Sequence, residues 1–192
     1  MQGETFFERA QFKKSPPKFF GATLHEGTVW PDLKTWPLPK TKDEAGDFIR
    51  AYERLKLEMD RLKKHEDELN FFALELQSRR ISQGIWKGFP ILIYGALSDY
   101  GRSYIRPLIT LGVVAAIGAI AFSYFAARPI LEAIGLSCAN TLNVFGFRKD
   151  FFDLAKMDLG PWLDVIAAIQ TILGAILLFL VGLGIRNKFR MK

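Results

Sequence analysis

The sequence predicts an all-α membrane protein with two transmembrane helices and a further helical element between them. Residues 108–127 and 165–185 are uncharged apolar runs of 20 and 21 residues, and about 20 such residues cross a bilayer as an α-helix. Between these runs, segment 130–147 is apolar and rich in small residues but holds Glu132, Asn140 and Asn143, which favours an element that enters only half of the membrane. Before them, a heptad pattern predicts a long cytoplasmic amphipathic helix.

Residues 1–31 show a weak rhythm in which a small residue precedes a large apolar residue by two positions. The pairs are Thr5/Phe7, Ala10/Phe12, Ala22/Leu24 and Gly27/Val29. This rhythm predicts a degenerate pentapeptide-repeat segment, a remnant of a β-helix that is shorter than the three or so repeats a solenoid needs for stability. The alternative is an irregular polar arm with a chance rhythm.

A Pro-rich linker, 32–42, precedes the amphipathic helix that we expect over 43–83, and Gly84 and Gly88 are expected to end this helix. Thr41 and Glu44 have the spacing of a capping box, which starts a helix. A row of residues then recurs at alternating spacings of four and three, with Glu66 as its single polar member and Ala73 as a small one. The large apolar residues of this row form the expected seam: Phe48, Tyr52, Leu55, Met59, Leu62, Leu69 and Leu76. No second helix of matching length is expected before the spans, so this coiled-coil seam predicts a homo-oligomer. The alternative is that the helix packs against the membrane-proximal segment.

Segment 84–106 is expected to lie at the inner membrane interface, because its apolar part, 89–97, is far too short to span. Tyrosine and tryptophan residues in this segment favour the headgroup level, where Arg102 and Arg106 can contact lipid phosphates. The first span is expected at 107–127, with Pro107 in its first turn. The second is expected at 165–185.

The basic residues predict the topology. Arg102 and Arg106 precede the first span, and the tail at 186–192 adds further bases that can contact lipid headgroups: Arg186, Lys188 and Arg190. Basic residues collect on the cytoplasmic side of spans, so we expect a multi-pass inner-membrane protein with both termini in the cytoplasm. Nucleic-acid binding is not expected, because the 18 basic residues up to Arg106 are offset by 15 acidic ones.

The connection at 128–164 is expected to be either extracytoplasmic or re-entrant. Its apolar part could lie flat in the outer interface, enter the membrane beside a pore, or form a soluble loop. The polar candidates for lining a pore are Asn140, Thr141, Asn143, Gly146 and, from the second span, Gln170. For Gln170, a structural hydrogen bond across helices is the alternative.

Two stretches resemble the C-terminal membrane module of bacterial pentapeptide-repeat proteins: HEDELNFFALE at 65–75 and SDYGRS at 98–103. The resemblance covers about three quarters of the chain and implies repeats followed by two spans. The module is also similar in outline to two-span ion-channel subunits. However, the potassium-filter pattern TVGYG is absent, and Arg148 and Lys149 follow the nearest equivalent, so potassium selectivity is not expected.

No sequence pattern predicts catalysis, a cofactor or a metal site. The chain has one cysteine, Cys138, and its two histidines lack partners at ligand spacing. Two functions therefore compete: an oligomeric, channel-like pore of unknown selectivity, and a membrane-anchored scaffold whose cytoplasmic coiled coil and repeats bind a protein partner. In both cases the lipid bilayer is a partner.

Overall fold

The computed structural model describes residues 4–143, 146 and 161–190. Within these residues it contains five α-helices, a short 3₁₀ helix and no β-strand beyond one isolated bridge. The chain divides into two compact units. Unit 1 comprises residues 1–102 and 186–192, and unit 2 comprises residues 103–185.

The N-terminal arm of unit 1 is irregular. Its isolated bridge pairs Phe6 with Val29 in parallel, through hydrogen bonds from Phe7 N to Val29 O (2.8 Å) and from Val29 N to Thr5 O (3.1 Å). The described residues show no coil of a β-helix around this bridge, so the pentapeptide-repeat segment stays a prediction. After the arm, the 3₁₀ helix η1 (Leu33–Thr35) is capped by the Asp32 side chain.

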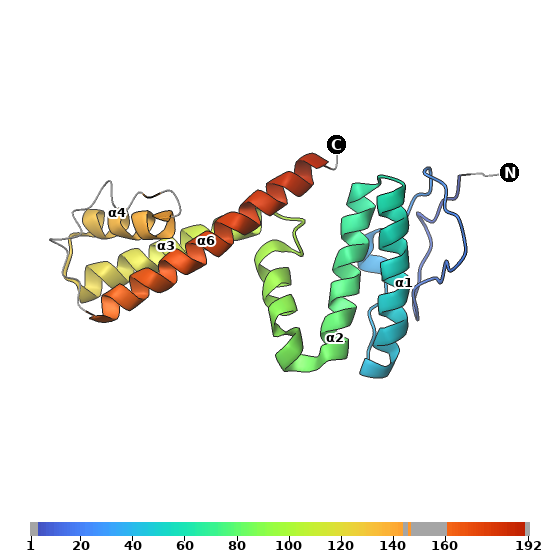
Figure 1. The fold of residues 1–192 in the computed structure, drawn as a ribbon, viewed down its shortest axis with the longest axis horizontal. Helices are drawn as coiled ribbons and strands as arrows, with labels where there is room; N and C mark the ends of the chain where they lie inside the picture. The colour runs from blue at the N-terminus through green and yellow to red at the C-terminus, as the bar shows by residue number, and fades with distance from the viewer. Residues whose placement is uncertain (1–3, 144–145, 147–160, 191–192) are drawn as a thin grey trace. The chain divides into compact units, whose positions relative to one another are not determined.

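Two helices in unit 1 form a hairpin in place of the single helix expected over 43–83. Helix α1 covers Lys42–Arg61, and helix α2 covers His65–Ser98 (Figure 1). The predicted cap is confirmed at the start of α1, where Thr41 Oγ1 accepts a hydrogen bond from Glu44 N at 3.4 Å. The continuous helix was a wrong prediction, because Lys63 adopts a positive φ of 59° and turns the chain.

The hairpin also corrects the premise of the oligomer seam. Phe48, Tyr52, Leu55 and Met59 are at most 4% exposed and pack in one cluster with Phe71 and Leu74 of α2 and with Leu24 and Trp36. The remaining seam residues, Leu62, Leu69 and Leu76, are half-buried. The apolar row thus has partners within its own chain, and the row by itself no longer predicts association with a second copy.

Helix α2 consists of two segments that meet at Gly84, whose φ of 75° and ψ of −172° are not helical. A Cβ at Gly88 would lie 2.9 Å from the backbone oxygen of Arg80, so the segment after the break passes close to the one before it. The second segment ends at Asp99 in the left-handed conformation. Gly84 therefore ends the first segment, as its position in the sequence predicts.

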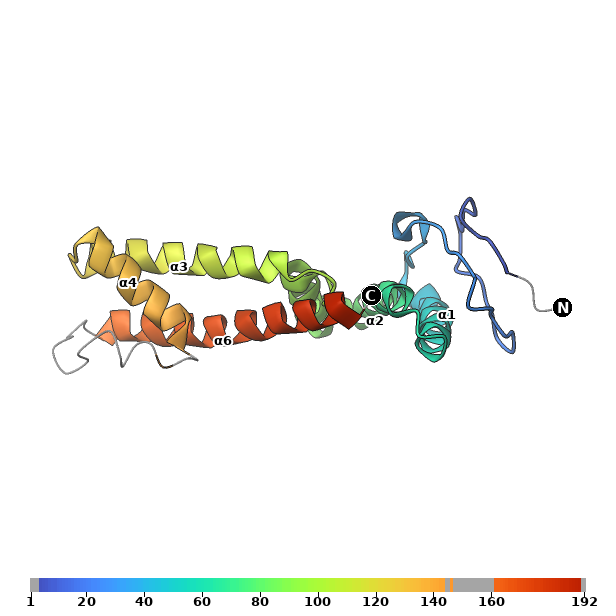
Figure 2. The ribbon, with the colours of Figure 1, turned by 90° about the horizontal axis from the view of Figure 1, so that it is seen from above.

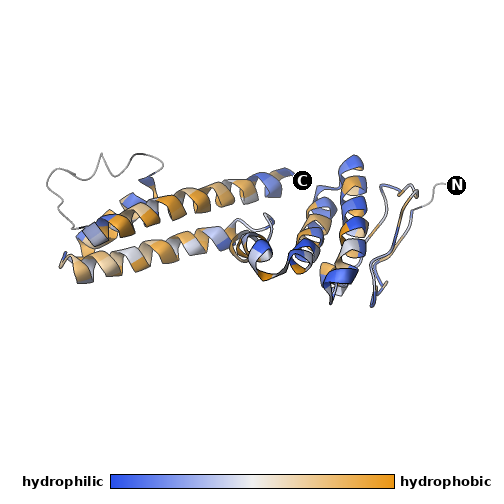
Figure 3. Cartoon of the chain, turned by 60° about the horizontal axis from the view of Figure 1, so that its bottom comes forward, coloured by the Kyte–Doolittle hydropathy of each residue, from blue (hydrophilic) through white to orange (hydrophobic). Residues whose placement is uncertain are grey.

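Unit 2 contains α3 (Ile105–Phe125), α4 (Ile130–Thr141) and most of α6 (Pro161–Arg190). Helices α3 and α6 are each long and apolar enough to cross a membrane, and apolar residues follow both along their length (Figure 3). Most of the apolar window in each helix is exposed, unlike the core helix of a soluble protein. Two membrane-spanning helices are thus supported, with boundaries a few residues from those expected.

Candidate functional site

Helix α4 turns back along α3. Only 126–129 separate the end of α3 from the start of α4, and Ser137 Oγ donates a hydrogen bond to Ala115 O at 2.6 Å. Ala115 is the middle residue of α3. Figure 2 shows α4 lying against α3 and α6 near one end of the pair, so the C-terminal end of α4 lies about half-way along α3.

The same end of α4 is bonded to α6. Gln170 Nε2 donates to Ser137 Oγ at 2.5 Å and to Val114 O at 3.3 Å. Thr171 Oγ1 donates to Asn140 O at 3.1 Å. These bonds connect three helices at one level and confirm the structural alternative for Gln170, a hydrogen bond across helices.

We define the polar cluster as the five polar side chains at this junction: Ser137, Asn140, Thr141, Gln170 and Thr171. The helices approach closely there because two glycines leave room for them. A Cβ at Gly118 would collide with the Gln170 and Ser137 side chains, and one at Gly174 would collide with the backbone carbonyl of Thr141. Small residues permit such close packing between membrane helices.

Part of the polar cluster lacks a protein partner. Asn140 is 0% exposed and Gln170 is 3% exposed. Both polar atoms of the Asn140 side-chain amide and the Oε1 atom of Gln170 are nevertheless without a hydrogen-bond partner. A buried polar group without a partner is costly and calls for a structural or functional reason. Chemically, the cluster offers amides and hydroxyls, which coordinate and hydrogen-bond but supply no general base.

The structure separates the five predicted pore residues into two sets. Asn140, Thr141 and Gln170 are buried among α3, α4 and α6, so in this arrangement they face the protein interior. Asn143 and Gly146 follow the end of α4 and are half-buried, with Gly146 N donating to Asn143 O at 2.8 Å. The rest of the connection, residues 144–145 and 147–160, lies outside the described residues.

A group of possible metal ligands in unit 1 was not found from the sequence. Asp60, His65 and Glu68 place one donor atom each within 4.8 Å of one another. However, Arg190 forms ion pairs with Asp60 at 3.4 Å and with Glu68 at 3.3 Å. The guanidinium already supplies a positive charge to these carboxylates, so we do not assign a metal site here.

Two of the predicted lipid-headgroup residues have partners in unit 1. Arg102 forms an ion pair with Asp99 at 2.9 Å and donates to Asn70 Oδ1 at 3.1 Å, and Arg190 is paired as described above. Lys188 and Arg186 are exposed. Headgroup contact stays a prediction for all five basic residues, Arg106 included, and the exposed Lys188 and Arg186 are the freest to make it.

Comparisons with protein-family models, with curated proteins and with solved structures found no match to this chain.

Proposed function

We propose that the chain is one subunit of an oligomeric membrane protein with a channel-like pore of unknown selectivity. In this proposal α3 and α6 cross the inner membrane, α4 enters it from the extracytoplasmic side and stops half-way, and the segment after α4 faces the pore. Both termini are cytoplasmic, as the basic flanks predict. The similarity to pentapeptide-repeat membrane modules in the sequence agrees with this architecture.

The position of α4 carries the proposal. A helix lying flat in the interface could touch α3 only near its end, whereas Ser137 bonds to the middle residue of α3. The junction with Gln170 and Thr171 of α6 lies at the same depth. We therefore favour the re-entrant arrangement over the interfacial one.

A helix that ends at mid-membrane needs water, an ion or protein around its last carbonyls, because these groups have no partner within the helix. Thr171 bonds to the carbonyl of Asn140. The next carbonyls along the chain belong to Thr141 and Leu142, where the negative end of the helix dipole favours a cation or water. A water-filled pore beside this end would supply that environment, and Asn143 is the nearest described polar side chain after α4.

Several subunits would have to surround such a pore. Because the cytoplasmic apolar row is buried within the chain, we place the subunit contacts on the exposed faces of α3, α4 and α6. Mass measurement of the assembly in native-like lipid tests this step. A Leu55→Asp variant should unfold unit 1, since Leu55 is 1% exposed, instead of only separating the subunits.

The pore is tested by conductance. Purified protein in planar bilayers should show discrete currents that Asn143→Leu reduces or changes in selectivity. Tyr124→Leu is the matched control, because Tyr124 lies in the last turn of α3, about 13 Å along the helix from Ala115, the level at which α4 ends. Absence of current, together with an assembly whose axis is filled by side chains or lipid, would reject the pore.

The second candidate function is a membrane-anchored scaffold that binds a cytoplasmic protein. The observation in its favour is the exposed aromatic surface of the N-terminal arm, where Phe6 is 64% and Phe20 is 57% exposed. A photocrosslinking residue at position 6 should then form a discrete adduct in cells. The same residue in place of Leu57, which is 54% exposed on α1, is the control and should form none.

A further inference from the structure

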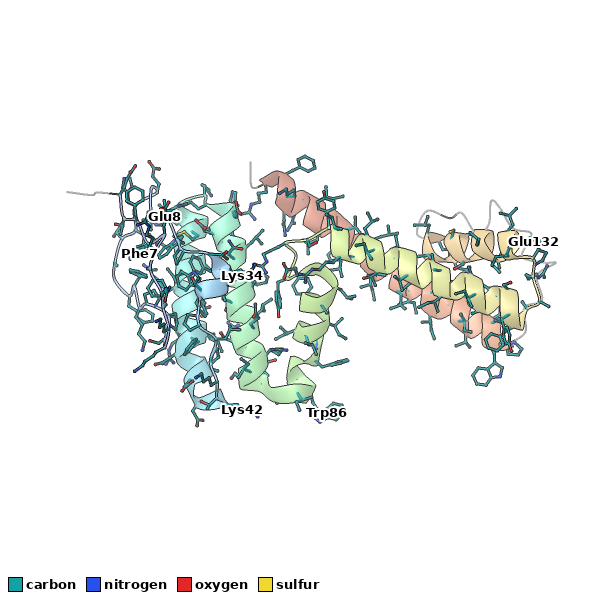
Figure 4. All side chains as sticks on the ribbon, turned by 180° about the vertical axis from the view of Figure 1, so that it is seen from behind. Phe7, Glu8, Lys34, Lys42, Trp86 and Glu132 are labelled. Atoms are coloured by element: carbon teal, nitrogen blue, oxygen red, sulfur yellow. The ribbon has the colours of Figure 1, made fainter. Side chains whose placement is uncertain are left out.

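The second segment of α2 has an apolar face that the described part of the chain leaves exposed. Its most exposed members are Ile85 and Trp86, at 86% and 90%, followed by Phe89 at 54%, Leu92 at 45% and Ile93 at 41%. The spacing of these residues places them on one side of a helix. In Figure 4, the labelled Trp86 lies at the turn of α2.

A groove of about 310 Å³ lies beside this face, in the bend of α2. Ile81, Ile85, Phe89 and Leu92 supply its apolar lining, and Arg80 is the charged residue of the lining. The close approach of Gly88 to the Arg80 backbone brings the two segments of α2 together at the groove. The groove is therefore a long apolar surface with one guanidinium at its wall.

Arg80 differs from its neighbours in having no carboxylate partner among the residues that the structure describes. The neighbouring Arg79 forms an ion pair with Glu75 at 2.8 Å, and Lys56 pairs with the same carboxylate at 2.6 Å. Among the ion pairs of the described residues, by contrast, none involves Arg80 or the exposed Lys87. Lys42 adds a third cation, since its Nζ lies 3.0 Å from where a Cβ on Gly84 would be.

We propose that this groove binds one anionic phospholipid, with an acyl chain along the apolar lining and the phosphate beside Arg80 and Lys42. The combination of apolar lining and unpaired cations matches the two parts of such a lipid. The site is also within reach of the bilayer. Six residues join Ser98 at the end of α2 to Ile105 at the start of α3, and they extend to about 20 Å at most.

This inference goes beyond the proposed pore, because it requires only that α3 crosses the membrane. Lipid bound here would hold unit 1 against the cytoplasmic leaflet and would make the membrane contact of α2 depend on lipid charge. A neutral phospholipid would fill the apolar lining but leave Arg80 without an anion. The site should therefore prefer phosphatidylglycerol to phosphatidylcholine.

The test uses the full chain in detergent micelles, with a tryptophan placed in the lining. Phe89→Trp in a Trp86→Phe/Trp162→Phe background leaves Trp30 and Trp36, which pack in the core of unit 1, as a constant signal. Phosphatidylglycerol with brominated acyl chains is then titrated and the fluorescence quenching is recorded. Brominated phosphatidylcholine is titrated in parallel.

We expect saturable quenching at a lower content of phosphatidylglycerol than of phosphatidylcholine. Arg80→Gln should raise the phosphatidylglycerol content at half-saturation about fivefold, which corresponds to ~1 kcal/mol for one basic residue at a membrane surface. Arg80→Lys should preserve most of the preference. Lys34→Gln is the charge-matched control, because Lys34 is exposed on η1 away from the groove, and it should change nothing.

Two results would overturn the site. Equal quenching by both lipids that Arg80→Gln leaves unchanged would show non-specific contact with the micelle. Absence of quenching by either lipid would show that the face is covered by protein, such as a second copy of the chain. The test is independent of conductance, so failure of the lipid site and failure of the pore are distinguishable.

Discussion

Units 1 and 2 both bury large apolar side chains between helices, but unit 1 relies on aromatic rings, whereas unit 2 adds close contacts at glycines and buried hydrogen bonds. In unit 1, Trp30 and Trp36 meet the ring of Phe71 edge-on, with centroids 5.5 and 5.0 Å apart. In unit 2, Phe122, Leu136 and Leu163 are buried with alanines, and the helices also meet closely at Gly118 and Gly174 and through hydrogen-bonded polar groups. Large rings bury area from water, whereas helices in lipid associate through close backbone approach and hydrogen bonds.

The contrast predicts that unit 1 fails when its core is made smaller. Phe71→Ala should destabilise unit 1 by about 3–5 kcal/mol, because Phe71 is 2% exposed and its loss leaves a cavity among aromatic rings. Urea unfolding followed by the fluorescence of Trp30 and Trp36 measures this change. Phe6→Ala, at a 64% exposed ring, should stay within about 0.5 kcal/mol; equal effects of the two variants would contradict the assigned core.

Unit 2 should instead fail when its contacts are made larger. Gly174→Ala should cost about 3 kcal/mol, since the added methyl group collides with the backbone of Thr141, which moves only if α4 moves. Thermal loss of helical circular dichroism in detergent reports the effect. Gly182→Ala meets nothing within 4 Å and should be neutral or slightly stabilising, so similar melting of the two variants would argue against the α4 contact.

The polar cluster tests whether every buried polar group stabilises unit 2, because the side-chain amide of Asn140 has no hydrogen-bond partner in the structure. Asn140→Leu should stabilise unit 2 by about 1 kcal/mol, since the side-chain atoms of Asn140 are buried without protein partners. The same melting experiment measures it. Loss of stability in Asn140→Leu would instead reveal a partner for the amide, while a gain in stability with loss of conductance would assign Asn140 to function.

The smallest expected effect concerns the polar link between the arm and α1. Glu58 Oε1 accepts hydrogen bonds from Arg61 Nη2 at 2.5 Å and from Leu24 N at 3.4 Å. The bond from Arg61 is the main cause that lowers the pKa of Glu58 below its usual value. A lowered folded-state pKa means that this stability is present above the unfolded pKa of about 4.3 and is lost as the pH falls through the folded pKa.

Glu58→Gln should therefore reduce the stability of unit 1 at neutral pH and flatten its loss in acid below about pH 4.3. Acid titration of Trp30 and Trp36 fluorescence measures both. Asp47→Asn is the comparison, because the pKa of Asp47 is also lowered, by Lys18 and Arg50, but its side chain is half-exposed. An unchanged acid transition in Glu58→Gln would show that the hydrogen bonds of Glu58 with Arg61 and Leu24 do not stabilise unit 1.

The sequence predicts the two membrane-spanning helices well, because the length and apolarity of a segment determine whether it can cross the membrane. Both spans, the cap at Thr41 and the break at Gly84 follow from local patterns. The turn at Lys63 could not be predicted from the heptad row, because a seam has the same pattern whether its partner is another chain or the next helix. A retrospective signal exists in the acidic first turn of α2, Glu66 to Glu68, which favours a helix start.

The candidate site was predicted in composition but not in arrangement. The polar residues near the end of α4 stood out because they interrupt an apolar segment. Their burial could not be deduced, since it depends on Gly118 and Gly174 lying opposite Gln170 and Thr141. The lipid groove was missed for a similar reason: Arg80 and Phe89 share a surface only because the chain bends at Gly84.

The depth of α4 tests the central claim most directly. Leu131 and Cys138 are seven residues apart on the exposed side of α4, which is about 10 Å along a helix. Nitroxide labels at the native Cys138 and, in a Leu131→Cys/Cys138→Ala variant, at position 131 report membrane depth through collisions with oxygen and a nickel chelate. A re-entrant helix predicts that the label at 138 lies deeper by several ångströms; equal, shallow depths at both positions would show that α4 lies flat and would contradict the account.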